Sequence, residues 1–338
     1  MKKYVYLLLG VLLFVISCTT NKSSNENIKT IELSDSLKVD SLTLLIKSNH
    51  KNAVLYAERS NVNYKLGNIE TAISDLQLAN ALDSLNPDYF VKLADLYLQM
   101  GKSEEVNRIL LKGNKLVPNN NNILYRLGNL YFYIQDYKNS MKYLNESKEI
   151  DPYFAPVYFT KALVLKELGD TAQAVKNLQI AVEREPDYYD AYMQLGLLYS
   201  LRPDSIAIDY YNNALALDPT SYEAFYGKAF FYQQNDKPEM AIAIYKQMLN
   251  ELSNNLPVVH FNLGYIEMIY YANYKDALAY FDSSIMFSNI YPDAYCNKAF
   301  CLEKLGNKTE ARKAYKKALE LVPNFEIAII GLNRLDKK

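Results

Sequence analysis

The sequence contains no tryptophan, two histidines and three cysteines among its 338 residues, so the side chains that most often build catalytic and metal sites are scarce. Catalysis at neutral pH commonly needs a nucleophile beside a base, a pair of carboxylates in a cleft or a metal cluster. Neither His50 nor His260 has a cysteine or carboxylate partner at the spacing of zinc ligands, and no glycine-rich phosphate loop occurs. We therefore expect no enzymatic activity, no cofactor and no metal.

The chain also lacks an excess of charge of either sign, since its formal net charge is -1. Binding to nucleic acid needs a basic face that neutralises phosphates, so we expect no nucleic-acid partner. After the N-terminal segment, no apolar run is long enough to cross a bilayer. Tyrosine is abundant, with 31 copies, and most of these fall at regularly spaced positions where we expect them to pack between helices.

The dominant feature of the chain is a pattern of small residues that recurs eight times between Ala53 and Phe325. Each unit has three small positions, and the period is about 34 residues. Val106 and Met248 are the larger exceptions. The first series is Ser60, Ala94, Gly128, Ala162, Gly196, Ala229, Gly264 and Ala299; the second is Ala72, Val106, Ser140, Ala174, Ala207, Ala241, Ala277 and Ala311; the third is Ala79, Gly113, Ser147, Ala181, Ala214, Met248, Ser284 and Ala318.

These residues resemble the tetratricopeptide repeat, a helix-turn-helix unit, and the stretch from Asp190 to Tyr199 is similar to its first helix. The resemblance implies an all-α fold: an α-solenoid of about eight repeats over residues 53–325, forming a right-handed superhelix. In such a fold the small residues let helix backbones approach, and aromatic residues fill the space between neighbouring hairpins. The turn between the two helices of a unit favours a left-handed backbone, which suits glycines such as Gly67 and Gly306.

Two further helices are expected at the ends of the repeat array. Residues 35–52 precede the repeats, and Asp35 to Lys47 has enough apolar residues for one amphipathic helix. Residues 326–338 follow the repeats, and Glu326 to Leu335 is interpreted as a capping helix that covers the last unit.

The extreme N-terminus predicts export and lipidation. Residues 1–17 have a basic start, an uncharged apolar run from Tyr4 to Ile16 and a small residue before Cys18, which is typical of a signal peptide. The end of this segment resembles a bacterial lipobox, which implies acylation of Cys18, palmitate included; a plain secretory signal is the alternative. Residues 18–34 are predicted to form a flexible tether, because the stretch from Thr19 to Thr30 has almost nothing apolar. In the sorting rule known for enteric lipoproteins, only an aspartate after the cysteine retains the protein at the inner membrane, so the resemblance and Thr19 favour the outer membrane facing the periplasm. Some bacterial groups use acidic signals after the cysteine for surface display, and Asn25 and Glu26 leave that location open.

The resemblance places the inner surface of the solenoid on the first helix of each unit, where two positions per repeat face the groove. These predicted groove residues are mostly apolar or aromatic, although inter-repeat packing is the alternative interpretation for each. The carboxylate clamp known in this family is absent, because Arg126 and Asn129 have no lysines in register. The predicted groove residues are Tyr125, Asn129, Phe159, Leu163, Met193, Leu197, Tyr226, Phe230, Phe261, Tyr265, Cys296 and Phe300.

Cys296 and Cys301 lie five positions apart and would point about 140° away from each other on one helix, so they are expected to be packed thiols. Cys296 is the better candidate for a disulfide with a partner, because its repeat position usually faces the groove. His260 takes the place of an aromatic residue in other repeats and is predicted to be a packed side chain.

The sequence therefore predicts a lipid-anchored scaffold of the cell envelope that binds a partner protein or peptide through an apolar groove. Two alternatives remain. One is binding to glycan or peptidoglycan, because tyrosine rings can stack on sugars. The other is homotypic filling of the groove, by the helix over residues 35–47 or by a second copy of the chain.

Overall fold

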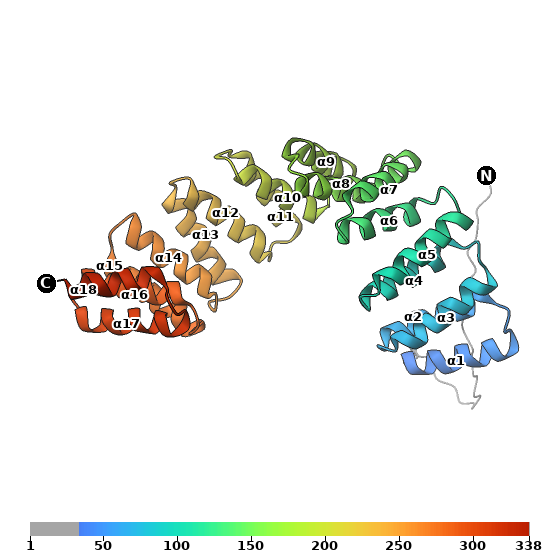
Figure 1. Ribbon diagram of the computed structural model, residues 1–338, viewed down its shortest axis with the longest axis horizontal. Helices are drawn as coiled ribbons and strands as arrows, with labels where there is room; N and C mark the ends of the chain where they lie inside the picture. Colours follow the sequence, from blue (N-terminus) through green and yellow to red (C-terminus); the bar gives the residue numbers. More distant parts are fainter. Residues whose placement is uncertain (1–33, 338) are drawn as a thin grey trace, which may run out of the picture. The chain divides into compact units, whose positions relative to one another are not determined.

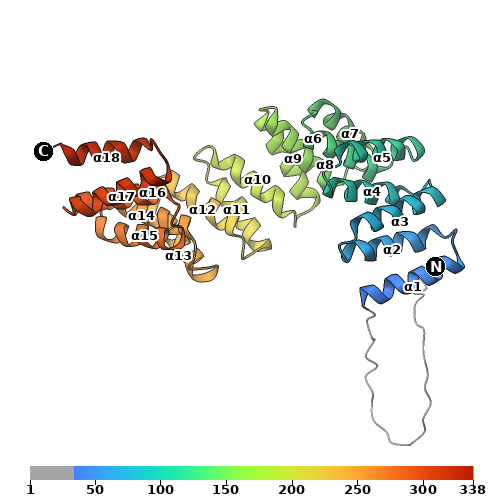
Figure 2. The ribbon, with the colours of Figure 1, turned by 60° about the horizontal axis from the view of Figure 1, so that its bottom comes forward.

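The computed structural model describes residues 34–337, and this part of the chain is entirely helical apart from turns and connections. Figures 1 and 2 show helices that follow one another as antiparallel hairpins. The helices are α1 (Asp35–Ser48), α2 (Ala53–Lys65), α3 (Ile69–Leu82), α4 (Pro87–Gln99), α5 (Ser103–Leu116), α6 (Asn121–Tyr133), α7 (Tyr137–Ile150), α8 (Ala155–Glu167), α9 (Thr171–Arg184), α10 (Tyr189–Ser200), α11 (Ile206–Leu217), α12 (Tyr222–Gln234), α13 (Pro238–Glu251), α14 (Pro257–Ile269), α15 (Tyr274–Phe287), α16 (Pro292–Lys304), α17 (Lys308–Leu321) and α18 (Glu326–Asp336).

The chain divides into two compact units after Asp75. In the first unit, Arg59 of α2 donates two hydrogen bonds to the Asp75 carboxylate, at 2.9 Å from Nε to Oδ2 and 2.6 Å from Nη2 to Oδ1. The Ser60 hydroxyl donates to the carbonyl oxygen of Ala72 at 2.7 Å. Asp75 is almost fully buried, so this paired charge is satisfied by hydrogen bonds where an isolated carboxylate would be costly.

In the second unit, each helix contacts the helices before and after it in the sequence. First helices of successive hairpins also contact each other, as α4 with α6 and α10 with α12. This local pattern is that of an α-solenoid. The small residues explain the close approach, because all three series are buried throughout the array. An added Cβ at Gly128 would lie 2.6 Å from Leu144 side-chain atoms, and one at Gly264 would lie 2.9 Å from the Phe281 ring. Large side chains from the second helix of a hairpin therefore pack directly on the small residues of its first helix.

The turn inside seven of the eight repeat hairpins uses a left-handed residue, and the turn between α10 and α11 is the exception. Gly67, Gly101, Gly169 and Gly306 have φ between +69° and +84°. Non-glycine residues take the same place in three other repeats, where Gln135, Asp236 and Ala272 have φ of +62°, +53° and +50°. A side chain in this region of backbone space is strained, so these three turns cost stability that a glycine would not.

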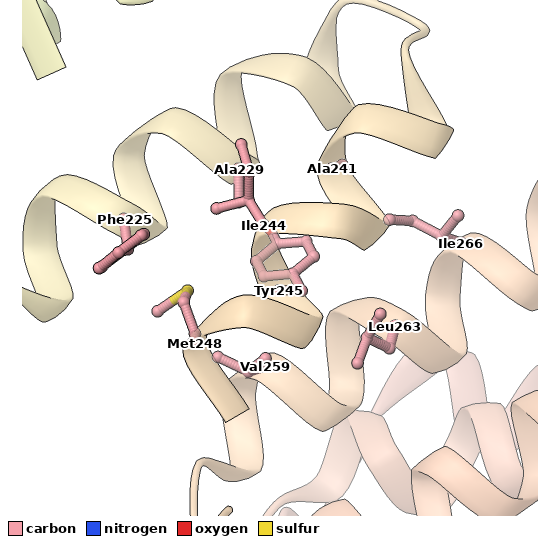
Figure 3. Packing of buried hydrophobic residues seen from close by; sticks show 9 residues of the cluster. All are labelled: Phe225, Ala229, Ala241, Ile244, Tyr245, Met248, Val259, Leu263 and Ile266. Atoms are coloured by element: carbon pink, nitrogen blue, oxygen red, sulfur yellow. The ribbon is translucent and has the colours of Figure 1, made fainter. Parts of the chain in front are cut away.

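Buried apolar residues form clusters that each join successive helices. One cluster draws on α12, α13 and α14, and Figure 3 shows Tyr245 of α13 in its midst, with Ala229 and Leu263 contributed by the flanking helices. The Tyr245 hydroxyl donates to Gln233 Oε1 at 3.0 Å and accepts from Asn262 Nδ2 at 3.1 Å. Burial, the largest influence, raises the pKa of Tyr245. The ring thus packs in the core while its hydroxyl stays satisfied.

Both terminal segments expected to be helical contain a helix, in α1 and in α18. The last helix is held by Arg334, whose Nε lies 2.6 Å from Glu303 Oε1 and whose Nη2 donates to the Tyr315 hydroxyl at 2.9 Å. Apolar residues of α18, including Ala328 and Leu335, join the buried cluster of the last repeat. The predicted signal peptide, Cys18 and nearly all of the predicted tether lie outside the described residues. Within residues 34–337, no helix has the length and apolar character to span a membrane.

Candidate partner-binding groove

Four of the predicted groove residues line one cavity of about 450 Å³, called here the Tyr125 cavity. Tyr125 and Asn129 come from α6, and Phe159 and Leu163 come from α8. The spacing of four along each helix puts each pair on one face, and successive first helices bring the two faces together. All four side chains are partly exposed, so this apolar surface is open to a ligand.

Polar groups in the Tyr125 cavity are paired with one another. Arg126 Nη2 donates to Asp95 Oδ2 at 3.0 Å, and the Thr160 hydroxyl donates to Asn129 Oδ1 at 2.8 Å. Partial burial raises the pKa of Asp95, and the nearby Arg126 guanidinium opposes that rise. Because the two charges compensate each other, this cavity offers mainly its apolar wall to a ligand.

Four more predicted residues line a second cavity of about 470 Å³, called here the Tyr226 cavity. Met193 and Leu197 come from α10, and Tyr226 and Phe230 come from α12. Leu197 and Phe230 are exposed at 47% and 40%, well above the exposure of core residues. Tyr222 stacks on Tyr226 with ring centroids 5.7 Å apart, and Tyr226 stacks on Phe230 at 5.8 Å. One wall of the cavity is therefore a row of three aromatic rings.

The groove residues further along the chain do not line either cavity. Phe261 stacks on Tyr265 at 6.4 Å between centroids and also packs against Phe281 and Tyr291. Phe300 is covered by cations, since Lys304 Nζ lies 5.2 Å and the Arg334 guanidinium carbon 5.5 Å from its ring centroid. Phe261 and Phe300 therefore pack against side chains of their own and neighbouring helices, whereas Tyr265 is 36% exposed.

The placement of Cys296 in the groove is wrong. Its side chain is 1% exposed and lies in the buried cluster with Tyr315 of α17 and with Ala328 and Leu335 of α18. The short side chain lets these neighbours close over it. Burial raises the pKa of the Cys296 thiol to about 12, and that of the fully buried Cys301 to about 12 as well. Both are packed thiols, and a disulfide from Cys296 to a partner would require the helices to separate.

Two tyrosines at the starts of first helices were missed by sequence reasoning. Tyr188 lines the Tyr125 cavity and Tyr222 lines the Tyr226 cavity. Burial raises the pKa of both phenols, with Tyr226 and Glu223 adding to the effect at Tyr222. The sequence contains a pattern that could have identified them, because Phe154, Tyr188 and Tyr222 follow one another at intervals of 34 residues. An aromatic residue recurring at the repeat period belongs with the groove set.

His260 is a packed side chain in α14. It is 6% exposed and stacks on Phe287 at 5.4 Å between ring centroids, and its Nε2 lies 2.9 Å from the carbonyl oxygen of Asn254. Among residues 34–337, no group of histidine, cysteine, aspartate and glutamate side chains is arranged to hold a metal ion.

Stacked helix hairpins with buried small residues at their contacts define the class of α-solenoid repeat proteins. Models described as "Tetratricopeptide repeat" match residues 122–154, 159–204, 210–243 and 292–325. The chain belongs to the tetratricopeptide-repeat family. Repeats of this family form scaffolds that bind protein or peptide partners.

Relatives share the repeats at low identity. The bovine (Bos taurus) BBSome complex member BBS4 is 22% identical over 80% of this chain and 60% of its own length. A TPR repeat-containing protein of Methanocaldococcus jannaschii is 25% identical over 80% of this chain and 38% of its own length. The human protein O-mannosyl-transferase TMTC3 is 25% identical over 51% of this chain but only 20% of its own length. The chain thus spans less than two thirds of these relatives.

Solved structures show the same fold. The C-terminal part of a TPR repeat-containing protein from Cytophaga hutchinsonii superposes with a TM-score of 0.63 at 20% identity, covering 72% of this chain and 99% of that structure. A tetratricopeptide repeat protein from Parabacteroides merdae superposes with a TM-score of 0.51 at 15% identity, covering 74% of this chain and 98% of that structure. At these identities the likeness concerns the fold alone.

Proposed function

We propose that this chain is a non-enzymatic scaffold that binds an extended segment of a partner protein along its first helices. The observation that carries the proposal is the grouping of eight predicted groove residues into only two cavities, the Tyr125 cavity and the Tyr226 cavity. Each cavity has the size range of ligand sites in proteins, and each is walled by aromatic and aliphatic side chains. The match to BBS4, described as a member of a complex, is consistent with a role in assembly.

The two cavities suit a segment that inserts a side chain into each. A few buried anchors supply most of the free energy of such binding, while the surrounding contacts exclude water. The cavities lie on α6 and α8 and on α10 and α12, so one extended segment would cross successive first helices to reach both. An extended segment fits this arrangement because its side chains are spaced along its length.

The proposal includes attachment to the envelope through acylated Cys18, with the outer membrane facing the periplasm as the favoured location. Support comes from residues 1–18, whose basic start, apolar run and Cys18 resemble a lipoprotein signal. Each buried methylene of an acyl chain would contribute about 0.8 kcal/mol to membrane attachment. Cys18→Ala should shift the protein from the membrane fraction to the soluble fraction or block its processing. A mature-length Cys18→Ala product that still sediments with membranes would contradict this part of the proposal.

Selection from a random decapeptide display library tests the groove assignment. The full chain should enrich a set of related peptides, and the double variant Leu197→Ser/Phe230→Ser should lose at least about tenfold of that enrichment, because two exposed anchors are removed. The matched control is Met286→Ser/Ile290→Ser, which removes two apolar side chains that are 69% and 74% exposed outside both cavities. It should enrich the same peptides as the parent chain.

Equal enrichment by the groove variant and the control would exclude the groove as the binding surface. Calorimetry with muropeptides and chitin oligosaccharides tests the glycan alternative, since heat from sugars together with no peptide enrichment would favour it. Light scattering tests self-assembly, since oligomers that dissociate on Leu197→Ser/Phe230→Ser would place a second copy of the chain in the groove.

A further inference from the structure

The two cavities differ in charge. In the Tyr125 cavity, Asp95 and Arg126 neutralise each other through their ion pair at 3.0 Å. In the Tyr226 cavity, Glu223 is the one charged residue among those that line it. Within residues 34–337 its carboxylate has no hydrogen-bond or ion-pair partner, and the residue is exposed. The Tyr226 cavity therefore carries an uncompensated negative charge.

The aromatic row beside Glu223 adds to this negative character. Tyr222, Tyr226 and Phe230 lie at intervals of four on α12, with planes inclined by 13° and 10° to one another. Their centroid separations of 5.7 and 5.8 Å exceed the carbon contact distance of about 3.5–4.0 Å, so the rings do not fully cover one another's faces. The face of an aromatic ring is electron-rich and attracts a cation placed over it.

The opposite wall of the cavity, formed by the end of α10, is mainly aliphatic. Met193, Leu197 and Leu201 supply apolar surface, and Gln194 supplies an amide. A neighbouring cation, Lys166 of α8, does not line the cavity; its Nζ donates to Gln194 Oε1 at 3.1 Å. The Lys166 ammonium thus lies on the α8 side, while Glu223 and the rings belong to α12.

We propose that the Tyr226 cavity binds a basic side chain of the partner segment, arginine or lysine. The aliphatic stem lies along Leu197 and Met193, and the cationic head group sits over the Tyr226 and Phe230 rings within reach of the Glu223 carboxylate. Arginine suits the site better than lysine, because its planar guanidinium stacks on rings and is more weakly hydrated. This inference rests on the proposed function and adds the chemistry that the partner must present.

The display selection tests the inference through the composition of the enriched peptides. Peptides selected by the full chain should share a basic residue next to apolar ones. A synthetic peptide of that sequence is then compared by calorimetry with versions in which its basic residue is replaced by lysine, by citrulline, which is neutral and nearly the same shape, or by leucine. The citrulline and leucine versions should bind the parent chain at least about fivefold more weakly.

Two variants assign that preference to the cavity. Glu223→Gln should reduce the ratio of arginine to citrulline affinity by at least about fivefold, because it removes the carboxylate but keeps the shape. Phe230→Leu should reduce the ratio as well, because it keeps an apolar side chain but removes the ring face. Glu183→Gln is the matched control, since it makes the same charge change at an exposed position of α9 and should leave the ratio unchanged.

The outcomes separate the two proposals. Enriched peptides without a basic residue, or a preference for arginine that Glu223→Gln leaves intact, would overturn the cation site while the peptide-binding function stands. A library that yields no enriched peptide would overturn the proposed function and the cation site together. Loss of the preference in Glu223→Gln but not in Glu183→Gln would support both.

Discussion

Gly196 gives a sharp test of how closely the hairpins pack. A Cβ added at Gly196 of α10 would lie 2.7 Å from Cε1 and 2.9 Å from Cδ1 of Tyr211, which is only 3% exposed. The ring has little room to move away, because a Cβ at Gly227 of α12 would also lie 2.7 Å from Cε1 of the same ring. Overpacking of this kind costs about 1–3 kcal/mol. Helix propensity acts in the opposite direction and favours replacement of glycine by up to about 1 kcal/mol.

We therefore expect Gly196→Leu to lower the free energy of unfolding by about 1–3 kcal/mol, and Gly196→Ala to be destabilising despite its better propensity. In a Tyr211→Leu background, Gly196→Ala should become neutral or stabilising, since the clash is removed. Amide hydrogen exchange is the suitable assay because repeat arrays open locally. Exchange in α10 and α11 should accelerate about 5- to 150-fold, with α16 and α17 unchanged. Unaltered exchange in α10 and α11 would refute the packing argument.

Two other predictions concern a turn and a charge pair. Ala272→Gly should stabilise the protein by about 0.5–1 kcal/mol, because Ala272 has φ of +50°. Gly306→Ala, at φ of +84°, should destabilise it similarly in thermal melting, and opposite signs would contradict the strain argument. Arg334 holds the pKa of Glu303 below its ordinary value. The ion pair therefore stabilises α18 fully at pH values above about 4.3, the pKa of glutamate in the unfolded chain. This stabilisation is lost as the pH falls through the lowered pKa of Glu303 in the folded protein. Exchange protection of α18 should fall over that acidic range in the parent chain but change less in Glu303→Gln.

The helical repeat and its register could be predicted from residues that are close in the sequence. Spacing along a helix decides which side chains share a face, so the buried series through Gly128, Gly196 and Gly264 followed from the period alone. The pairs Tyr226 with Phe230 and Tyr125 with Asn129 were found in the same way, as neighbours on one helix. The aromatic residues at the starts of two first helices, Tyr188 and Tyr222, follow the same period but were not included among the predicted groove residues.

Cys296 shows where this reasoning ends. Its repeat position is the one that holds Phe261 and Tyr226 in neighbouring units, but the short cysteine side chain lies in a cluster with Ala328 and Leu335 of α18. Whether a face is open depends on the size of its own side chains and on what packs over them. That second condition involves residues far apart in the sequence, and the repeat pattern does not contain it.

The sequence by itself determined the helix hairpins, their period, the small residues at their contacts and the helical faces on which apolar residues gather. These properties follow from local geometry, because one turn of helix fixes the neighbours of each side chain. Only the tertiary structure decided that Asp95 and Arg126 neutralise each other while Glu223 stays unpaired, and that Phe300 is covered while Phe230 is open. Such differences arise where side chains from separate helices meet, since charge compensation and burial depend on distance in space.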